Sequence, residues 1–360
     1  MTAAYREPMS HLAGVVGVLP EHRHTQARLT RTVADMLGLE GVDREVLERF
    51  HRNAGVSERY LVRPIEDYAA LGDFGERNDI FLVEATALGE RAIKQALAHA
   101  GVEPADVDVL ITTTITGLAV PSLDARLVGP LGLRDDVKRI PIVGLGCVAG
   151  AAGIARAHDH LVGHPDDVVV LLAIELCSLT VQQHDTSTPN LVASGLFADG
   201  AGAVVLTGAN WPPAQRAPRI RSTRSRLYPD TERAMGWDVR GTGMQIVLGA
   251  EVPDLVRENV RGDTDRFLAE HGLTRADIGW WVAHPGGPKV LDALADALEI
   301  EPDALGVTWR SLDRIGNLSS ASVLHVLADT LTDRPPEPGS LGVLLAMGPG
   351  FCLELVLLEA

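Results

Sequence analysis

The stretch GVEPADVDVLITTT at residues 101–114 returns in altered form as GLTRADIGWWVAHP at residues 272–285. Each copy follows a segment with apolar residues at helical spacing, over residues 80–100 and 253–271, and runs into an apolar strand. The matching positions are Gly101 and Gly272, Ala105 and Ala276, Asp106 and Asp277, and Val107 and Ile278, always 171 residues apart. The repeat predicts two related halves in which strands and helices alternate, the pattern of a layered α/β protein.

Both halves end in a comparable pair of apolar runs, which we expect to be strands. Their ranges are 166–175 and 201–208 in the first half and 339–348 and 351–360 in the second. Between them, the stretch NWPPA at residues 210–214 and the pair Ala217-Pro218 interrupt regular structure. We therefore expect an N-terminal half over residues 1–211 and a C-terminal half over residues 219–360.

The composition is that of a globular protein. Of 360 residues, 46% are hydrophobic and 22% charged, which excludes a disordered chain and a fibrous repeat. Lys and Arg total 32 against 48 Asp and Glu, a net charge of −16 without a basic stripe, so nucleic acid is not an expected partner. No apolar run approaches the roughly 18 to 20 residues of a membrane helix. Since the three cysteines are too few for a disulfide framework, we expect a cytoplasmic protein with no membrane contact.

The first candidate for chemistry is Cys147, in VGLGCVAGAAGIARAHDHLVG at residues 143–163. An apolar strand runs into glycines that permit a sharp turn, and small residues then open a helix. The free N–H groups and positive end of that helix favour a thiolate, so we expect a depressed pKa and a nucleophilic sulfur. The alternative is that Cys147 is a small buried hydrophobic residue.

A cysteine nucleophile needs a partner for its proton or its charge, usually a histidine. His284 follows the apolar strand IGWWVA and precedes Pro285-Gly286-Gly287, where a side chain is held in place. By contrast, we expect two other histidine pairs to be solvated surface groups and not metal sites. They are His158 with His160 and His22 with His24.

The third candidate is Asn317, in GNLSSASVLHVLADTL from residue 316. Its amide can donate a hydrogen bond to a developing oxyanion, although an asparagine before a helix is more often an N-cap. Cys147, His284 and Asn317 all stand at strand-to-helix junctions, where α/β sheets gather their sites. Together they form one possible acyl-transfer site.

Five motifs in order give the chain a family resemblance. They are GLGCVAG around Cys147, LFADGAGAVVL at residues 196–206, HPGGPKVLDAL at 284–294, GNLSSASVL at 316–324 and MGPG at 347–350. The chain resembles a bacterial type III polyketide synthase of the chalcone synthase superfamily. The resemblance implies a five-layered αβαβα thiolase-like fold made of two pseudo-duplicated halves, and a homodimer. It also implies that Cys147 carries acyl groups and that His284 and Asn317 stabilise its thiolate and the enolate or oxyanion.

The same resemblance implies further site residues. Phe197 and Ile246 match two gatekeeper positions, the second of which is phenylalanine in the plant enzymes. The positions that match the cavity wall are Ile115, Thr116, Val120, Cys177, Thr180, Trp237 and Ser319. Trp237 replaces a glycine, which is expected to shorten or redirect the growing chain. Arg52 and Arg49 match basic residues that meet coenzyme A phosphates.

The activity implied is that an acyl-CoA starter loads Cys147, malonyl-CoA extends it by decarboxylative Claisen condensation, and the poly-β-keto chain closes to a polyphenol or pyrone. No metal or organic cofactor is implied. One alternative is the priming ketoacyl-carrier-protein synthase of fatty-acid synthesis, against which the HPGG and MGPG motifs argue. A noncatalytic thiolase-like scaffold subunit is another. The starter, the number of extensions and the ring closure do not follow from the sequence.

Overall fold

The two copies of the repeated stretch fold alike in the structure, a computed structural model that describes residues 9–212 and 217–360. Helix α3 (Phe74–Ala100) ends at Gly101, which has φ 65°, and Gly272 after helix α7 (Val252–Ala269) has φ 69°. Only glycine adopts such a left-handed conformation readily. The short 3-10 helices η2 (Pro104–Asp106) and η5 (Arg275–Asp277) follow, each with a capping box closed by its aspartate. The constant offset of 171 residues thus relates two equivalent helix ends.

The remaining elements alternate only in part, because some strands and some helices follow one another directly along the chain. The strands are β1 (Ser10–Val18), β2 (His22–Thr25), β3 (Glu58–Leu61), β4 (Val109–Thr113), β5 (Lys138–Ile142), β6 (Val168–Leu176), β7 (Asp199–Gly208), β8 (Arg219–Leu227), β9 (Met235–Arg240), β10 (Gly243–Leu248), β11 (Ile278–Ala283), β12 (Leu341–Gly348) and β13 (Cys352–Glu359). The other helices are α1 (Gln26–Met36), α2 (Gly41–Arg52), η1 (Ile65–Ala70), α4 (Leu123–Leu131), η3 (Gly146–Val148), α5 (Ala149–Gly163), η4 (Cys177–Thr180), α6 (Thr188–Leu196), α8 (Pro288–Leu298), η6 (Pro302–Leu305), α9 (Gly306–Ile315), η7 (Ser319–Ala321) and α10 (Ser322–Asp333). The predicted helices and paired terminal strands are confirmed.

The largest sheet has nine strands in the order β11-β12-β13-β8-β1-β7-β6-β4-β5. Its two sides repeat one topology: β4 and β6 are parallel, as are β11 and β12, while β6 with β7 and β12 with β13 are antiparallel. The sides meet where β1 pairs with β8, at Ser10 opposite Ile220 and His11 opposite Arg219. Residues 213–216 of the expected boundary between the halves lie outside the described residues.

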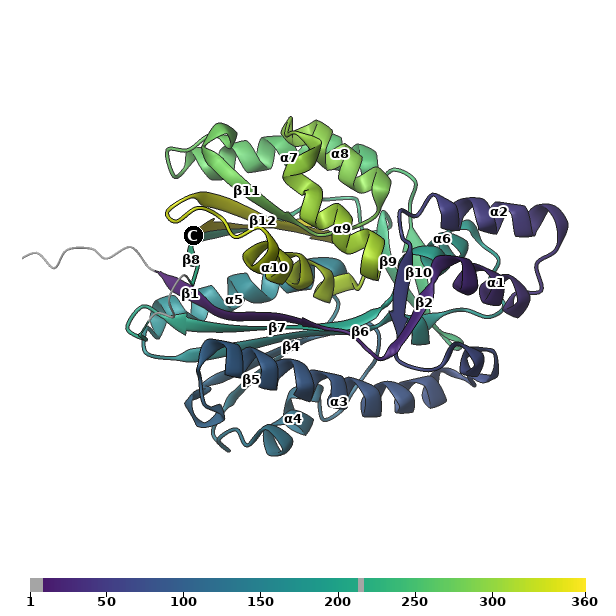
Figure 1. The fold of residues 1–360 in the computed structure, drawn as a ribbon, viewed down its shortest axis with the longest axis horizontal. Coiled ribbons are helices and arrows are strands. Elements are labelled where there is room, and N and C mark those ends of the chain that lie inside the picture. The colour runs from purple at the N-terminus through teal and green to yellow at the C-terminus, as the bar shows by residue number, and fades with distance from the viewer. Residues whose placement is uncertain (1–8, 213–216) are drawn as a thin grey trace, which may run out of the picture.

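Five layers follow from this arrangement (Figure 1). The part of the sheet around β6 and the part around β12 form two layers that face each other. Helices α5 and α10 lie between them, α3 and α4 cover the outer face of the first layer, and α7 and α8 cover the outer face of the second. Along β6, Val169 and Leu171 face the central helices, whereas Val170 and Leu172 face α3. Strands buried on both faces read as continuous apolar runs, which explains the sequence pattern. The predicted αβαβα fold is confirmed.

The two central helices approach each other closely where the site lies. Each begins after a 3-10 turn, η3 before α5 and η7 before α10. A Cβ atom at Gly150 would lie 2.3 Å from the carbonyl oxygen of Ser320, so only glycine permits this contact. The contact brings the turn that carries Cys147 next to the turn that carries Ser319.

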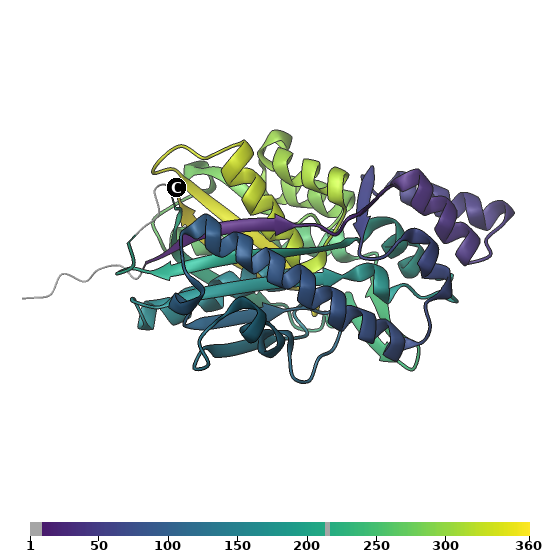
Figure 2. The same cartoon turned by 60° about the horizontal axis from the view of Figure 1, so that its bottom comes forward.

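Further elements gather at this end of the layers. They are α1, α2, α6 and the two-stranded hairpin of β9 and β10, and Figure 2 shows α1 and α2 extending beyond the sheet. Within the described part of the chain, no helix combines the length and the apolar character needed to cross a membrane.

Candidate active site

Two cavities lie at this end of the fold, and both are open to solvent. The first, which we call the cysteine cavity, is lined by Cys147, His284, Asn317 and Ser319 together with apolar side chains. The second cavity is lined by residues of α1, η1, η4 and α6, among them Leu29, Tyr68, Cys177, Thr180 and Asn190. The structure therefore brings the three predicted catalytic residues together in one chamber.

Cys147 is the middle residue of η3, two residues before the first residue of α5. Its remaining exposed surface faces the cysteine cavity, and its thiol donates to Ser319 Oγ at 3.6 Å. Burial raises the pKa of the Cys147 thiol to about 12, and the nearby carboxylate of Glu175 raises it further, against the hydrogen bond to Ser319. The predicted depressed pKa is thus wrong, because burial of the thiol outweighs the favourable helix start.

His284 follows β11, and its backbone N–H donates to Leu345 on β12 at 3.0 Å. The side chain is 3% exposed, and burial lowers its pKa to about 3, so the imidazole is neutral. Among the described residues neither ring nitrogen has a hydrogen-bond partner. Buried polar groups are normally hydrogen-bonded, so a ring without partners lowers the stability of the fold. Both nitrogens of His284 are therefore free to bind a substrate.

Asn317 is held by its backbone and by one end of its amide. Its N–H donates to Leu196 and its carbonyl accepts from Ala198, both at 2.9 Å. Its Oδ1 accepts from the N–H of Ser319 at 2.8 Å and from the Ser322 hydroxyl at 3.4 Å. The carbonyl end is thus occupied, and Nδ2 remains as a donor for the cavity. The amide does not act as a simple N-cap, since Oδ1 binds within the η7 turn.

Three side chains line both cavities: Phe197, Trp237 and Ile246. Trp237 on β9 lies directly opposite Ile246 on β10. Phe197 follows α6, and its backbone forms an isolated bridge with Asn317. The two predicted gatekeepers and the substituted tryptophan therefore form a partition between the chambers.

The predicted wall residues are divided among several places. Cys177 and Thr180 line the second cavity, and Ser319 lines the cysteine cavity. Thr116 and Thr180 border a smaller hollow beside Phe74. The Thr116 hydroxyl and the Ile115 N–H both donate to the buried Glu175 carboxylate at 3.0 Å. Burial raises the pKa of Glu175, and these donors oppose that shift.

Four predicted site residues line none of the three hollows within residues 9–212 and 217–360, namely Ile115, Val120, Arg52 and Arg49. Val120 is 96% exposed and lines neither cavity, so in a single chain it is not a wall residue. Arg52 and Arg49 are exposed on α2 and also line neither cavity; Arg52 is 3.8 Å from Glu48. If Arg52 and Arg49 bind the coenzyme A phosphates, the substrate must therefore extend from α2 to the cysteine cavity.

Sequence reasoning missed Arg59, which is buried behind the partition. Its guanidinium donates to the Phe197 carbonyl at 2.7 Å and to Gln26 Oε1 at 3.0 Å. Burial lowers the pKa of Arg59 to about 10, and the carboxylate of Asp199 opposes that shift. Sequence reasoning also missed the apolar wall of the cysteine cavity, which includes Val252, Val256 and Val290. Helical spacing alone predicts only that such residues are buried.

Two of the four histidines expected at the surface are buried. His158 is 5% exposed and its Nδ1 lies 2.9 Å from Ser10 Oγ. His24 is buried on β2. The expectation is wrong for both, because the elements that cover them come from distant parts of the chain.

The chain is similar to known proteins over nearly its whole length. The family models of the N-terminal and C-terminal domains of chalcone and stilbene synthases match residues 44–210 and 219–360. A 1,3,6,8-tetrahydroxynaphthalene synthase of Streptomyces peucetius subsp. caesius is 54% identical, over 97% of this chain and 92% of the relative. A phloroglucinol synthase of Pseudomonas fluorescens is 31% identical, over 95% of this chain and 97% of the relative.

Solved structures agree. The 1,3,6,8-tetrahydroxynaphthalene synthase of Streptomyces coelicolor A3(2), a bacterial type III polyketide synthase, superposes with a TM-score of 0.91 at 32% identity, covering 97% of this chain and 99% of that chain. PKS-I of the brown alga Ectocarpus siliculosus gives a TM-score of 0.91 at 26% identity, covering 99% and 100%. The chain therefore belongs to the chalcone and stilbene synthase family and is a type III polyketide synthase of the bacterial kind, an acyltransferase.

Proposed function

We propose that the enzyme loads an acyl-CoA starter on Cys147, extends it with malonyl-CoA and closes the chain to a hydroxylated aromatic product. The observation that carries the proposal is that one cavity holds the Cys147 thiol, the unpartnered His284 ring and the free amide end of Asn317. The 54% identity to a tetrahydroxynaphthalene synthase supports that product class.

In the loading step, the sulfur of Cys147 attacks the thioester carbonyl carbon while its proton passes to a ring nitrogen of His284. The carbon–sulfur bond to coenzyme A then breaks, and coenzyme A leaves as a thiol with that proton. Because burial lowers the pKa of His284 to about 3, its ring holds the proton only briefly, so the proton moves while the sulfur–carbon bond forms. No hydrogen bond joins Cys147 to His284 among the described side chains, so substrate entry must draw the two groups together.

In the extension step, the bond between the malonyl methylene carbon and its carboxylate breaks and carbon dioxide leaves. The resulting enolate oxygen needs donors, and Asn317 Nδ2 and an N–H of neutral His284 can supply them in a chamber lined largely by apolar groups. The enolate carbon then attacks the Cys147 thioester, which frees the thiolate and leaves a chain longer by one unit on coenzyme A. Return of that chain to Cys147 starts the next round.

We also propose a homodimer. The edge strand β5 has exposed residues along most of its length, Ile140 among them, and Val143 directly after the strand is exposed too. The neighbouring loop exposes Leu118 and Val120. Exposed apolar side chains at a sheet edge are typical of a surface that another chain covers. Light scattering of the purified protein, with Val120→Glu as the disrupting variant, tests this.

The function is tested by incubating the purified enzyme with malonyl-CoA alone and with a mixture of acyl-CoAs, followed by mass spectrometry. Multiply extended cyclic products are expected. One-round products made only with an acyl carrier protein would instead indicate a priming ketoacyl synthase. Cys147→Ala is expected to abolish product, whereas Cys352→Ala, outside both cavities, should retain it. Unchanged product from Cys147→Ala would show that the sulfur does no chemistry.

A further inference from the structure

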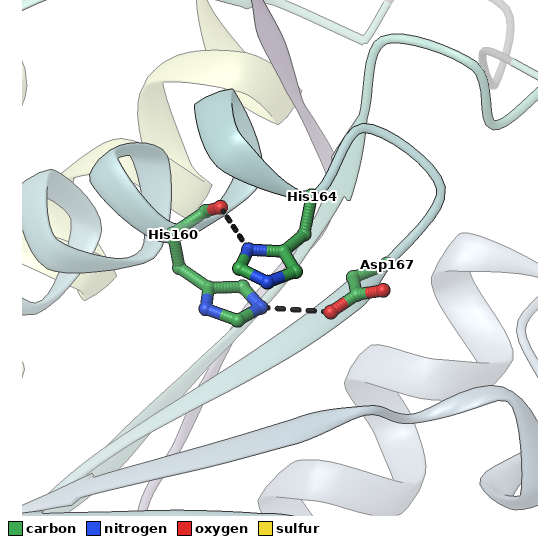
Figure 3. A group of neighbouring side chains, drawn as sticks. All are labelled: His160, His164 and Asp167. Carbon is green, nitrogen blue, oxygen red and sulfur yellow. Dashed lines mark hydrogen bonds and ion pairs between the residues drawn. The ribbon is translucent and has the colours of Figure 1, made fainter.

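Helix α5 carries a second group of chemically active side chains at its far end. His160 and His164 lie on its last turn and just beyond it, and Asp167 follows in the turn to β6 (Figure 3). One ligand atom from each of the three lies within 4.8 Å of the other two. At about 1.5 Å per residue, His160 is roughly 20 Å along the helix from Cys147. The cluster is therefore separate from the cysteine cavity.

The two imidazoles of His160 and His164 lie against each other. Residues four apart on a helix share a face, and the rings are stacked with centroids 4.3 Å apart and planes 3° apart. His164 Nδ1 donates to the backbone carbonyl of His160 at 3.1 Å, a bond drawn in Figure 3. With the proton on Nδ1, the lone pair of His164 stands on Nε2. A backbone carbonyl that fixes the tautomer in this way is the usual outer partner of a metal-binding histidine.

Hydrogen bonds hold Asp167 and its carboxylate in place. Its Oδ2 lies 2.8 Å from His160 Nε2. The Asp167 N–H donates to the His164 carbonyl, and the Asp167 carbonyl accepts from Gly208, both at 3.1 Å. The preceding Pro165 carbonyl accepts from Asn210 at 2.9 Å. The turn that carries Asp167 is thus tied both to α5 and to the end of β7.

We propose that His160 Nε2, His164 Nε2 and the Asp167 carboxylate bind a divalent transition-metal ion, Zn²⁺ best, with water in the remaining position. Two imidazoles and one carboxylate suit zinc, whereas Ca²⁺ and Mg²⁺ require oxygen ligands. Ligands at about 2.0–2.2 Å from zinc lie roughly 3.3 Å apart, so the exposed His164 ring must turn on binding and exchange its stacking on His160 for the metal. The proton now shared between His160 Nε2 and Asp167 then moves to His160 Nδ1 or to solvent.

One cation already stands near the site. Lys138 Nζ on β5 is 3.9 Å from Asp167 Oδ2, with a largely exposed side chain. It offers weak competition, since a single exposed ion pair contributes little to stability. The metal would join the end of α5 to the start of β6, so its role is to stabilise the fold and not to catalyse. Sequence reasoning paired His160 with His158, whereas the structure pairs it with His164.

The test uses the full chain after treatment with a chelator, titrated with ZnCl₂ by calorimetry and by thermal unfolding. We expect one site that raises the unfolding midpoint, and affinity at least about tenfold lower in His164→Ala and in Asp167→Asn. His99→Ala is the matched control, because His99 is also exposed at a helix end, and it should bind as the unaltered chain does. Since His164 is exposed, its loss should leave the fold intact.

Equal zinc affinity in His164→Ala and the unaltered chain would overturn the proposal, as would no heat and no shift of the midpoint. Substitution with Co²⁺ adds a spectroscopic test. Nitrogen and oxygen ligands give weak visible bands without the intense near-ultraviolet band of a thiolate on cobalt. If that intense band appears and Cys147→Ala removes it, the ion sits in the cysteine cavity and the proposal is wrong.

Discussion

Trp237 and Ile246 lie directly opposite each other on the β9–β10 hairpin, and both side chains line the cysteine cavity and the second cavity. Cross-strand neighbours are within about 5.5 Å at Cβ, so an indole and a branched aliphatic chain act there as one partition. Phe197 adds to it from α6. Under the proposed mechanism, we expect the size of these side chains to decide how much of the second cavity a chain bound on Cys147 can reach.

Trp237→Ala is expected to join the two cavities and shift the products toward longer chains or other ring closures. Removal of the indole opens a path from Cys147 toward Cys177 and Thr180 in the second cavity. Product masses from a fixed pool of acyl-CoA and malonyl-CoA measure the effect. Val239→Ala is the control, since Val239 is exposed on the same strand. The same product distribution in Trp237→Ala and the unaltered enzyme would show that the partition does not limit the chain.

Ile246→Phe is expected to narrow the passage and to reduce the use of long starters. The rate with a long acyl-CoA relative to a short one should fall by roughly tenfold or more, the discrimination that a pocket gains from one or two methylene groups. The measurement is kcat/KM for a series of acyl-CoAs. Because Ile246 is partly exposed to both cavities, the larger ring should not overpack a closed core. Unaltered relative rates would count against a gate at this position.

The parts of the fold that depend on local chemistry could be predicted from the sequence. Gly101 and Gly272 adopt positive φ at helix ends, and Asp106 and Asp277 close capping boxes, so these residues recur in both halves. Strands buried on both faces, such as β6, could also be predicted, because they appear in the sequence as continuous apolar runs. Cys147 and His284 lie between a strand and a helix, as the sequence predicts, which is why they could be singled out. The same prediction is wrong for Asn317, because helix α9 and not a strand precedes it.

Features that depend on distant contacts could not be predicted. The pKa of Cys147 depends on how completely the cavity wall excludes water, and that wall comes from several elements. His158 is buried because Ser10, 148 residues away, lies beside it. The exposure of Val120 likewise depends on what the rest of the chain leaves uncovered. Local pattern carries no information about such contacts.

Asn317→Ala and His284→Gln are each expected to slow malonyl-CoA decarboxylation by about 100-fold or more, the usual cost of one donor aimed at a developing oxyanion. Carbon dioxide release measured without starter isolates this step from condensation. Asn259→Ala is the control, because that amide binds only the Leu255 carbonyl on α7 among the contacts described. Near-normal decarboxylation in either variant would contradict the role of that donor.

His325→Gln is expected to make the fold less sensitive to acid. His325 is buried on α10, where Nε2 lies 2.9 Å from the Ala201 carbonyl and the ring packs against Gly17. Burial lowers its pKa from 6.5 to about 4, and the bond to Ala201 opposes that shift. Between those values the unfolded chain binds a proton that the folded chain does not, so stability falls as the pH falls.

The free energy of unfolding, measured with urea from pH 7 to about pH 4, should therefore fall more steeply for the unaltered enzyme than for His325→Gln. The difference in slope is one proton, or about 1.4 kcal/mol per pH unit. Other titrating groups cancel because both proteins contain them. Parallel curves for the unaltered enzyme and His325→Gln would mean that His325 takes up its proton without unfolding.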